Sequence, residues 1–205
     1  VRETGAAYHA CHISTEEAVE LIRQAKKEGL PVSCEVTPHH LLLSDKDIDI
    51  NDADYKMNPP LRSEEDRLAL LEGVKDGTID IIATDHAPHH AEEKARGFAE
   101  APFGIAGLET CFSLLYTYLV LEGVITLERL VEMLTVKPAG LFGLETGVLE
   151  AGREADLVII DPEASFIIDG EDFHSKGKNT PFKGYRCRGK ILRTLVGGRE
   201  VYRGE

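Results

Sequence analysis

Short apolar runs alternate with amphipathic segments of helical length along the first 146 residues of the chain. Three of the runs predict strands, over residues 6–12, 31–36 and 79–83. Two intervening segments predict helices, one begun by Ser14 with Glu17 reaching back as a capping box, the other begun by Ser63. This alternation predicts parallel strands covered by helices, in an open doubly wound sheet or in part of a (β/α)₈ barrel.

The pattern changes after residue 146. Helical segments at about 105–122 and 126–142 end the alternating part, and β-like runs follow at 155–161, 165–168 and 190–196. Gly197-Gly198, between two apolar pairs, is typical of a two-residue hairpin turn. We therefore expect two parts, residues 1–146 and a small β-rich module over residues 147–205.

Composition excludes several classes of protein. The chain has 205 residues, of which 42% are hydrophobic and 29% charged, as in a globular protein. Its formal net charge of −13 argues against nucleic acid or an anionic membrane surface as the main partner. We expect no transmembrane segment and no secretory leader. Four cysteines without a C-x-x-C pair suit reduced thiols in a cytoplasm.

Histidines concentrate in the first ninety residues, which hold seven of the eight: His9, His12, His39, His40, His86, His89 and His90. His12, His39 and Asp85 each lie at the carboxyl end of a predicted strand. In a parallel α/β fold these ends open on one face, where loops carry function. Imidazole and carboxylate together suit a divalent cation such as zinc, which activates water for hydrolysis.

Each of these residues also has a structural interpretation. His9 is three positions from His12 and points to the opposite face of a strand, so it is better explained as a packed or hydrogen-bonded residue than as a ligand. His39-His40 after Pro38 is better explained as a polar turn than as a ligand pair. The histidines after Asp85 also fit a solvated loop. Spacing alone favours neither a metal site nor such a loop. Asp85 itself, at the mouth of a buried strand, favours a metal or proton donor as its partner.

Five segments together resemble dihydroorotases of the long bacterial type. They read YHACHIST (8–15), EVTPHHL (35–41), KMNPPLR (56–62), ATDHAPH (83–89) and APFG (101–104). A further pattern, G-x-L-x-x-G-x-x-A-D-L-V from Gly147, resembles the wider amidohydrolase superfamily. The resemblance covers the whole chain in unbroken order.

The resemblance implies a (β/α)₈ barrel with a binuclear zinc centre and a small β-sandwich. It implies reversible cyclisation of N-carbamoyl-L-aspartate to L-dihydroorotate in pyrimidine synthesis. The enzyme is expected to be a cytoplasmic homodimer that acts on this small-molecule substrate. His12 resembles a ligand of one zinc, and Asp85 resembles the carboxylate that binds the other zinc and acts as acid and base. The substrate contacts it implies are Asn58, His89 and the backbone of Phe103 and Gly104. His39 and His40 match family sequence but no family ligand.

The chain is shorter than the family pattern. A complete barrel takes about 250 residues, whereas three strands precede the β-rich module here. We therefore expect the last three β/α units of the barrel, a missing N-terminal half that supplies the family's His-x-His, and no activity of this chain alone. The alternatives are another cyclic amidohydrolase, such as an allantoinase or hydantoinase, and a non-catalytic scaffold that holds aspartate carbamoyltransferase. N-P-P-L-R at residues 58–62 and the His89 loop favour dihydroorotase.

Overall fold

The computed structural model describes residues 1–204, which form two compact units. The first unit joins residues 1–111 to the later segment 169–183, and the second joins residues 112–168 to residues 184–205. The predicted mixed α/β class is confirmed. The predicted division after residue 146, the barrel and the sandwich stay predictions.

A parallel sheet forms the centre of the first unit. Its strands are β1 (Tyr8–Ala10), β2 (Val32–Val36) and β3 (Ile81–Ile82), in the order β1-β2-β3. All three strands lie inside the predicted runs. The end strands are shorter than predicted. Just before β3, the Asp80 carboxylate accepts a hydrogen bond from the Cys34 amide at 2.8 Å in place of a backbone carbonyl.

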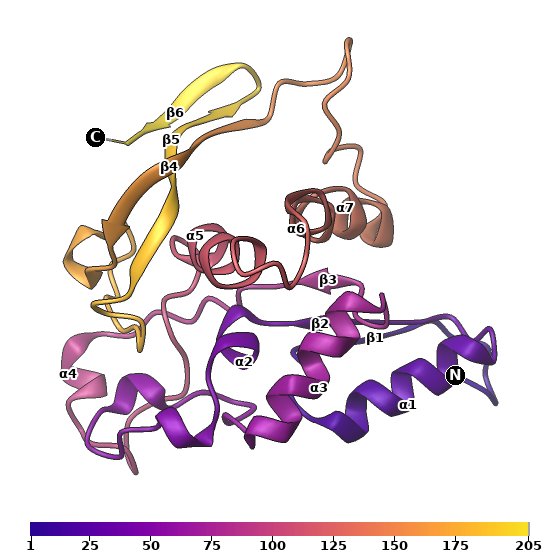
Figure 1. Cartoon of the computed structure of the whole chain (residues 1–205), viewed down its shortest axis with the longest axis horizontal. Coiled ribbons are helices and arrows are strands. Elements are labelled where there is room, and N and C mark those ends of the chain that lie inside the picture. The colour runs from indigo at the N-terminus through magenta and orange to yellow at the C-terminus, as the bar shows by residue number, and fades with distance from the viewer. Residues whose placement is uncertain (205) are drawn as a thin grey trace. The chain divides into compact units, whose positions relative to one another are not determined.

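Two helices, α1 (Glu16–Lys27) and α3 (Glu64–Lys75), pack beside this sheet (Figure 1). Cys34 and Val36 of β2 are fully buried, as are the side chains on the inner faces of both helices. Gly73 of α3 allows a close approach, because a Cβ there would lie 3.1 Å from side-chain atoms of Val19 and Ile79. Alternation along β2 then leaves Ser33 and Glu35 for the other face of the sheet.

The beginning of α1 differs from the prediction. Thr15, not Ser14, is the N-cap, and its hydroxyl accepts a hydrogen bond from the Ala18 amide at 3.1 Å. Ser14 is buried instead. The predicted cap of the other helix is confirmed, because the Ser63 hydroxyl accepts a hydrogen bond from the Asp66 amide at 3.2 Å.

Short helical turns and loops complete the first unit. They are α2 (Pro38–Leu42), η1 (Asp45–Asp47), η2 (Ala53–Tyr55), α4 (Ala91–Lys94) and η4 (Gly170–Asp172). The segment 169–183 is bonded to residues of this unit that are distant in sequence: the Thr180 amide donates to the Asp54 carboxylate at 3.0 Å, and Phe182 is 1% exposed. The unit is therefore built from two distant stretches of the chain.

The second unit begins within α5 (Cys111–Leu115), at residue 112, and the helix continues as the π-helical turn η3 (Tyr116–Val120). The single helix predicted at 126–142 is two helices, α6 (Leu127–Leu134) and α7 (Val136–Phe142), that meet at Thr135. Pro138 explains the break, because its ring would clash with the Leu134 carbonyl of a continuous helix.

An antiparallel sheet forms the rest of the second unit. Its strands are β4 (Leu157–Ile167), β5 (Arg186–Val196) and β6 (Arg199–Arg203), in that order. β4 is one strand with an irregularity between Asp161 and Ser165, where two strands were predicted. The predicted hairpin turn is confirmed, with positive φ at Gly197 and Gly198. Among residues 1–204, no helix has the length and apolar character needed to cross a bilayer.

Candidate active site

The carboxyl ends of the three parallel strands lie along one edge of the sheet. His12 follows β1 by two residues, and His39 and Asp85 follow β2 and β3 by three. Backbone hydrogen bonds hold these strand ends together: the Ile13 amide donates to the Glu35 carbonyl at 2.9 Å, and the Ala83 amide to the Val36 carbonyl at 3.0 Å. The sheet therefore brings to one edge the three residues that the sequence places at strand ends.

The backbone turns sharply at two of these three positions. Among the described residues other than glycine, His12 (φ 35°) and Asp85 (φ 48°) have a positive φ. This conformation is unfavourable for a residue with a Cβ, and it persists only where the surrounding structure enforces it. Such strain is concentrated at functional sites, and here it marks both residues that the family motifs single out.

His39 is buried without any hydrogen-bond partner. The residue is 1% exposed, and neither of its ring nitrogens has a partner; Nδ1 of His12 is likewise buried and without one. Burial lowers the pKa of His39 well below its ordinary value, and His40 and His12 lower it further. A neutral imidazole with a bare nitrogen is the form of histidine that binds a metal. His12 and His39 therefore fit a divalent cation.

His40, by contrast, has both ring nitrogens engaged by the protein. Its Nδ1 lies 2.7 Å from the Thr37 hydroxyl, and its Nε2 lies 3.0 Å from the Pro59 carbonyl oxygen. Burial lowers the pKa of His40 to about 4, so the ring is neutral. These bonds fix the loop at residue 59 against α2 and leave no nitrogen for a ligand. The interpretation of His39-His40 as a polar turn is wrong for both side chains, which are buried.

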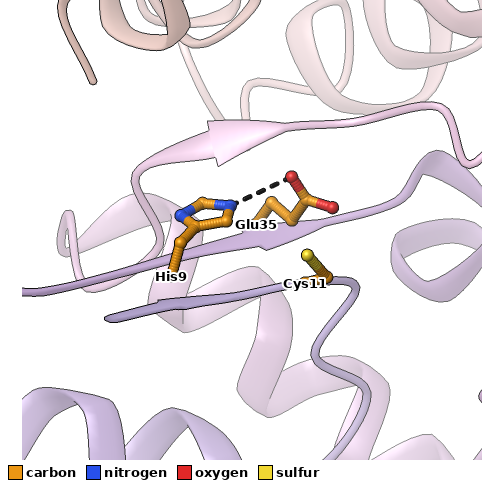
Figure 2. Close-up of side chains that lie close together, drawn as sticks. All are labelled: His9, Cys11 and Glu35. Atoms are coloured by element: carbon orange, nitrogen blue, oxygen red, sulfur yellow. Dashed lines mark hydrogen bonds and ion pairs between the residues drawn. The ribbon is translucent and has the colours of Figure 1, made fainter. Parts of the chain in front are cut away.

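A second group of potential ligands lies on the sheet face itself. His9, Cys11 and Glu35 offer ligand atoms that all lie within 4.8 Å of one another (Figure 2). His9 is already bonded at both nitrogens, through Nδ1 to the Ser33 hydroxyl at 2.8 Å and through Nε2 to the Glu35 carboxylate at 3.1 Å. The prediction that His9 is a hydrogen-bonded residue is confirmed.

Cys11 connects this group electrostatically to the strand ends. Its thiol has a raised pKa, first through desolvation and then through the negative charges of Glu35 and Asp85. The thiol is therefore protonated at neutral pH and is a poor ligand in this state.

The loop after β3 is tied to the segment around Phe103. His86 Nδ1 accepts hydrogen bonds from the Gly107 and Leu108 amides, each at 3.2 Å. His89 Nε2 lies 2.9 Å from the Phe103 carbonyl oxygen. Because Nδ1 of His86 accepts two hydrogen bonds, the ring is not available there as a ligand. His86 and His89 are therefore not solvated loop residues, because their rings hydrogen-bond to the backbone of the neighbouring loop.

The other predicted substrate residues lie near this loop or on the surface. Lys56 Nζ donates to the carbonyls of Ala99 and Ala101 and lies 4.7 Å from the centre of the Phe103 ring. Phe103 is exposed and Gly104 is buried. Asn58 is exposed on the loop between η2 and α3. The sequence favours a structural role for His39, and its position after a strand, like those of His12 and Asp85, is the signal that places it at this edge of the sheet.

Comparison with known proteins identifies the family. The amidohydrolase family model matches residues 1–201. The chain is 61% identical over 199 residues to the dihydroorotase of Geobacillus thermodenitrificans strain NG80-2 and 61% identical over 198 residues to that of Bacillus caldolyticus. Each match covers 97% of this chain and 46% of the relative, so the chain spans about half the length of the curated relatives it matches.

Solved structures agree with the family assignment. The dihydropyrimidinase of Brevibacillus agri NCHU1002 superposes with a TM-score of 0.92 at 29% identity, over 98% of this chain and 46% of that one. The L-hydantoinase of Arthrobacter aurescens superposes with a TM-score of 0.90 at 37% identity, over 100% of this chain and 47% of that one. The chain belongs to the amidohydrolase family.

Proposed function

We propose that this chain supplies one part of the active site of a zinc-dependent dihydroorotase, which interconverts N-carbamoyl-L-aspartate and L-dihydroorotate. The relatives at 61% identity bear the name dihydroorotase. The observation that carries the proposal is the set of buried, unpaired ring nitrogens on His12 and His39. Both residues follow strands at the edge of the sheet where Asp85 also lies. Buried polar atoms without partners are rare unless a ligand or ion satisfies them.

We assign the metal to His12 and Asp85, as the motifs predict, and add His39 as a further ligand. Membership of the amidohydrolase family implies a divalent metal, and nitrogen and carboxylate ligands together suit zinc. When bound, the metal supplies a Lewis acid and lowers the pKa of water near it. His12 and His39 bind it as neutral imidazoles, and burial keeps His39 neutral.

Asp85 is the proton carrier of the proposed reaction. In the hydrolytic direction, water adds to the ring amide carbonyl, the carbon–nitrogen bond breaks, and the nitrogen leaves with a proton. Asp85 takes the proton from the attacking water and gives it to that nitrogen, as a general base and then a general acid. Its place at the end of β3 on a sharply turned backbone holds the carboxylate at the rim of the sheet.

Asn58, His89 and the backbone of Phe103 and Gly104 are the proposed substrate contacts. The hydrogen bond from His89 to the Phe103 carbonyl supports the assignment, because it joins two of these segments into one surface. Asn58 is exposed on its loop and available to a ligand.

We propose that β1, β2 and β3 belong to the last three units of a (β/α)₈ barrel and that residues 147–205 belong to a β-sandwich module. Both β1 and β3 are edge strands of the described sheet. Parallel strands are stable when they are flanked by further strands and covered on both faces, which argues for additional β/α units beside them. We expect those units to come from an N-terminal half of the protein and the whole protein to form a homodimer. We expect this chain alone to be inactive.

A hydantoinase or another cyclic amidohydrolase is the second candidate. The similarity to the Arthrobacter aurescens L-hydantoinase, with its 37% identity, favours it. The higher identity to proteins named dihydroorotase weighs more. A non-catalytic scaffold for aspartate carbamoyltransferase is a third possibility, which the retention of His12, His39 and Asp85 disfavours.

A chimera tests the proposal. This chain replaces the matching stretch of the Geobacillus thermodenitrificans dihydroorotase, and purified protein is assayed with dihydroorotate, hydantoin and allantoin. We expect turnover of dihydroorotate above the other two, together with bound zinc in metal analysis. Preference for hydantoin or allantoin would establish the second candidate, and a folded, metal-free, inactive chimera would establish a scaffold. The parent enzyme is the matched control.

A further inference from the structure

Asn179, a residue outside every motif discussed above, bonds to both loops that carry the proposed substrate contacts. It is 5% exposed and lies on the segment 169–183, which belongs to the same compact unit as these loops. Its side-chain oxygen accepts a hydrogen bond from the His89 amide at 2.8 Å. Its side-chain nitrogen donates to the Gly104 carbonyl at 2.8 Å.

Two weaker or backbone contacts of Asn179 reach the same two loops. The side-chain nitrogen lies 3.5 Å from the Ala87 carbonyl, and the Asn179 carbonyl accepts a hydrogen bond from the Ala106 amide at 2.7 Å. One residue therefore holds the loop after β3 at residues 87–89 and the loop at residues 104–106. Both the oxygen and the nitrogen of one side-chain amide are used, so a side chain that only donates or only accepts hydrogen bonds cannot replace Asn179.

Tight packing leaves the loops little room to move away from this residue. A Cβ on Gly177 would lie 2.6 Å from the His89 nitrogen and 2.7 Å from the Pro88 side chain. A Cβ on Gly104 would lie 2.5 Å from the Ala87 Cβ. The absence of side chains at these two glycines brings the three backbones to the distance at which Asn179 can bridge them.

We infer that Asn179 is a positioning residue that sets the spacing between His89 and the Phe103-Gly104 backbone for substrate binding. The inference rests on the proposed function, because it takes those two segments as substrate contacts. Asn179 does not touch substrate in this scheme. It acts by orienting the His89 backbone and the Gly104 peptide, so that the two segments meet a ligand in one fixed arrangement without a conformational cost on binding.

The alternative is that Asn179 stabilises the fold and nothing more. The two roles differ in what a substitution changes. Loss of a residue that only stabilises lowers the melting temperature and leaves the KM of the folded enzyme unchanged. Loss of a residue that positions the substrate contacts raises KM and leaves kcat nearly unchanged, because these contacts lie away from the reacting carbonyl.

Hydrogen exchange on the 205-residue chain tests the contacts without any activity. In Asn179→Ala, the His89 amide should exchange about ten-fold faster or more, as expected for the loss of a buried hydrogen bond. Asn179→Asp has nearly the same volume and keeps the acceptor for His89, but it places a carboxylate against the Gly104 and Ala87 carbonyls. That variant should keep His89 protected. The Gly104 and Ala87 amides, which donate to the Lys56 and Ile105 carbonyls, should lose protection because the repelled loop moves away from Asn179. Unchanged exchange in both variants overturns the inference.

Kinetics of the chimera described above tests the role. We expect Asn179→Asp and Asn179→Ala to raise KM for dihydroorotate about ten-fold, with kcat within about two-fold of the parent chimera. Asn51, an exposed asparagine whose amide bonds to Asp49, offers matched controls in Asn51→Asp and Asn51→Ala, which should leave KM unchanged. A parent chimera without dihydroorotate turnover contradicts the proposed function and not the loop contacts. An active chimera in which both Asn179 variants keep the parental KM overturns the positioning role, whatever the melting temperatures.

Discussion

His12 and Asp85 adopt the same uncommon backbone conformation at the ends of two strands that lie on either side of β2. Their φ angles are 35° and 48°, in the left-handed region that glycine normally occupies. For a residue with a Cβ this region costs about 1–2 kcal/mol. Glycine at either position would remove that cost but also the side chain. The presence of an imidazole and a carboxylate at strained positions supports the proposed roles of these side chains.

Replacing Asp85 by Asn separates function from stability. Asn has nearly the same volume as Asp and tolerates a positive φ, so the free energy of unfolding should change by less than about 0.5 kcal/mol. The amide cannot carry the proton, so kcat of the chimera with dihydroorotate should fall by roughly 10²–10⁴-fold. Denaturant titration and steady-state kinetics measure the two effects. Asp49→Asn is the matched control, and near-parental turnover in Asp85→Asn would remove Asp85 from the mechanism.

The adjacent histidines of α2 should respond oppositely to the same substitution. In metal-free chain, His39→Leu removes two buried nitrogens that lack partners, so stability should be unchanged or rise by about 1 kcal/mol. His40→Leu leaves the Pro59 carbonyl without its partner and leaves the Thr37 hydroxyl with only the backbone amide of residue 40, so stability should fall by roughly 2 kcal/mol. Denaturant unfolding with a chelator present measures both.

Metal content provides the second half of this test. His39→Leu in the chimera should lower zinc affinity by at least about ten-fold, because a ligand is lost. His40→Leu should retain zinc wherever it folds. Equal destabilisation of the chain by both substitutions, with unchanged zinc affinity in His39→Leu, would show that His39 is an ordinary core residue.

The order of elements was predictable because the apolar periodicity is strong. Helix and strand alternate as the pattern indicates, and Ser63 caps α3 as its sequence suggests. The cap of α1 was not predictable, because Ser14 and Thr15 are adjacent and offer the same chemistry. Tertiary structure decides between them: Ser14 is buried near Arg62, with 3.5 Å between its hydroxyl and the guanidinium Nε, which leaves Thr15 at the helix end.

The candidate site was predictable only as far as strand ends can be located. His12 and Asp85 come directly after apolar runs, and their motifs supported the assignment. His39 and His40 are neighbours in sequence and opposite in surroundings, since one has no partner and the other has two. One of the two partners of His40 is the neighbouring Thr37, but the other is the Pro59 carbonyl, nineteen positions away, and no local pattern encodes that contact. Asn179 is the extreme case, since it lies ninety positions from His89.

The corrected cap makes a direct prediction. Thr15→Ala removes the acceptor for the Ala18 amide and should cost about 1 kcal/mol of stability. Ser14→Ala makes no change at the cap and should cost less, because its hydroxyl has only a long contact with Arg62. Urea titration of both variants beside the parent chain measures the difference. A larger loss in Ser14→Ala than in Thr15→Ala would place the functional cap one residue earlier.

The stability of the metal-free chain should fall as the pH falls from about 6.5 to about 4. The pKa of His40 is lowered from 6.5 to about 4 by burial, so in this window the unfolded chain binds a proton that the folded chain does not. Stability rises with pH wherever the unfolded state binds more protons, and a shift of this size corresponds to roughly 3 kcal/mol. His39, whose pKa burial also lowers well below its ordinary value, adds to the loss in the same direction.

The variants His40→Gln and His39→Gln assign the two parts of this pH dependence. Each replaces a titrating ring by a neutral amide, so each should flatten the fall in unfolding free energy between pH 6.5 and 4.5, although the absolute stability also changes. The measurement is urea unfolding at half-unit pH steps with a chelator present, and His174→Gln, at an exposed position outside this edge of the sheet, is the control. A parent chain with equal stability at pH 6.5 and 4.5 would mean that these imidazoles accept protons while folded, which is incompatible with their burial.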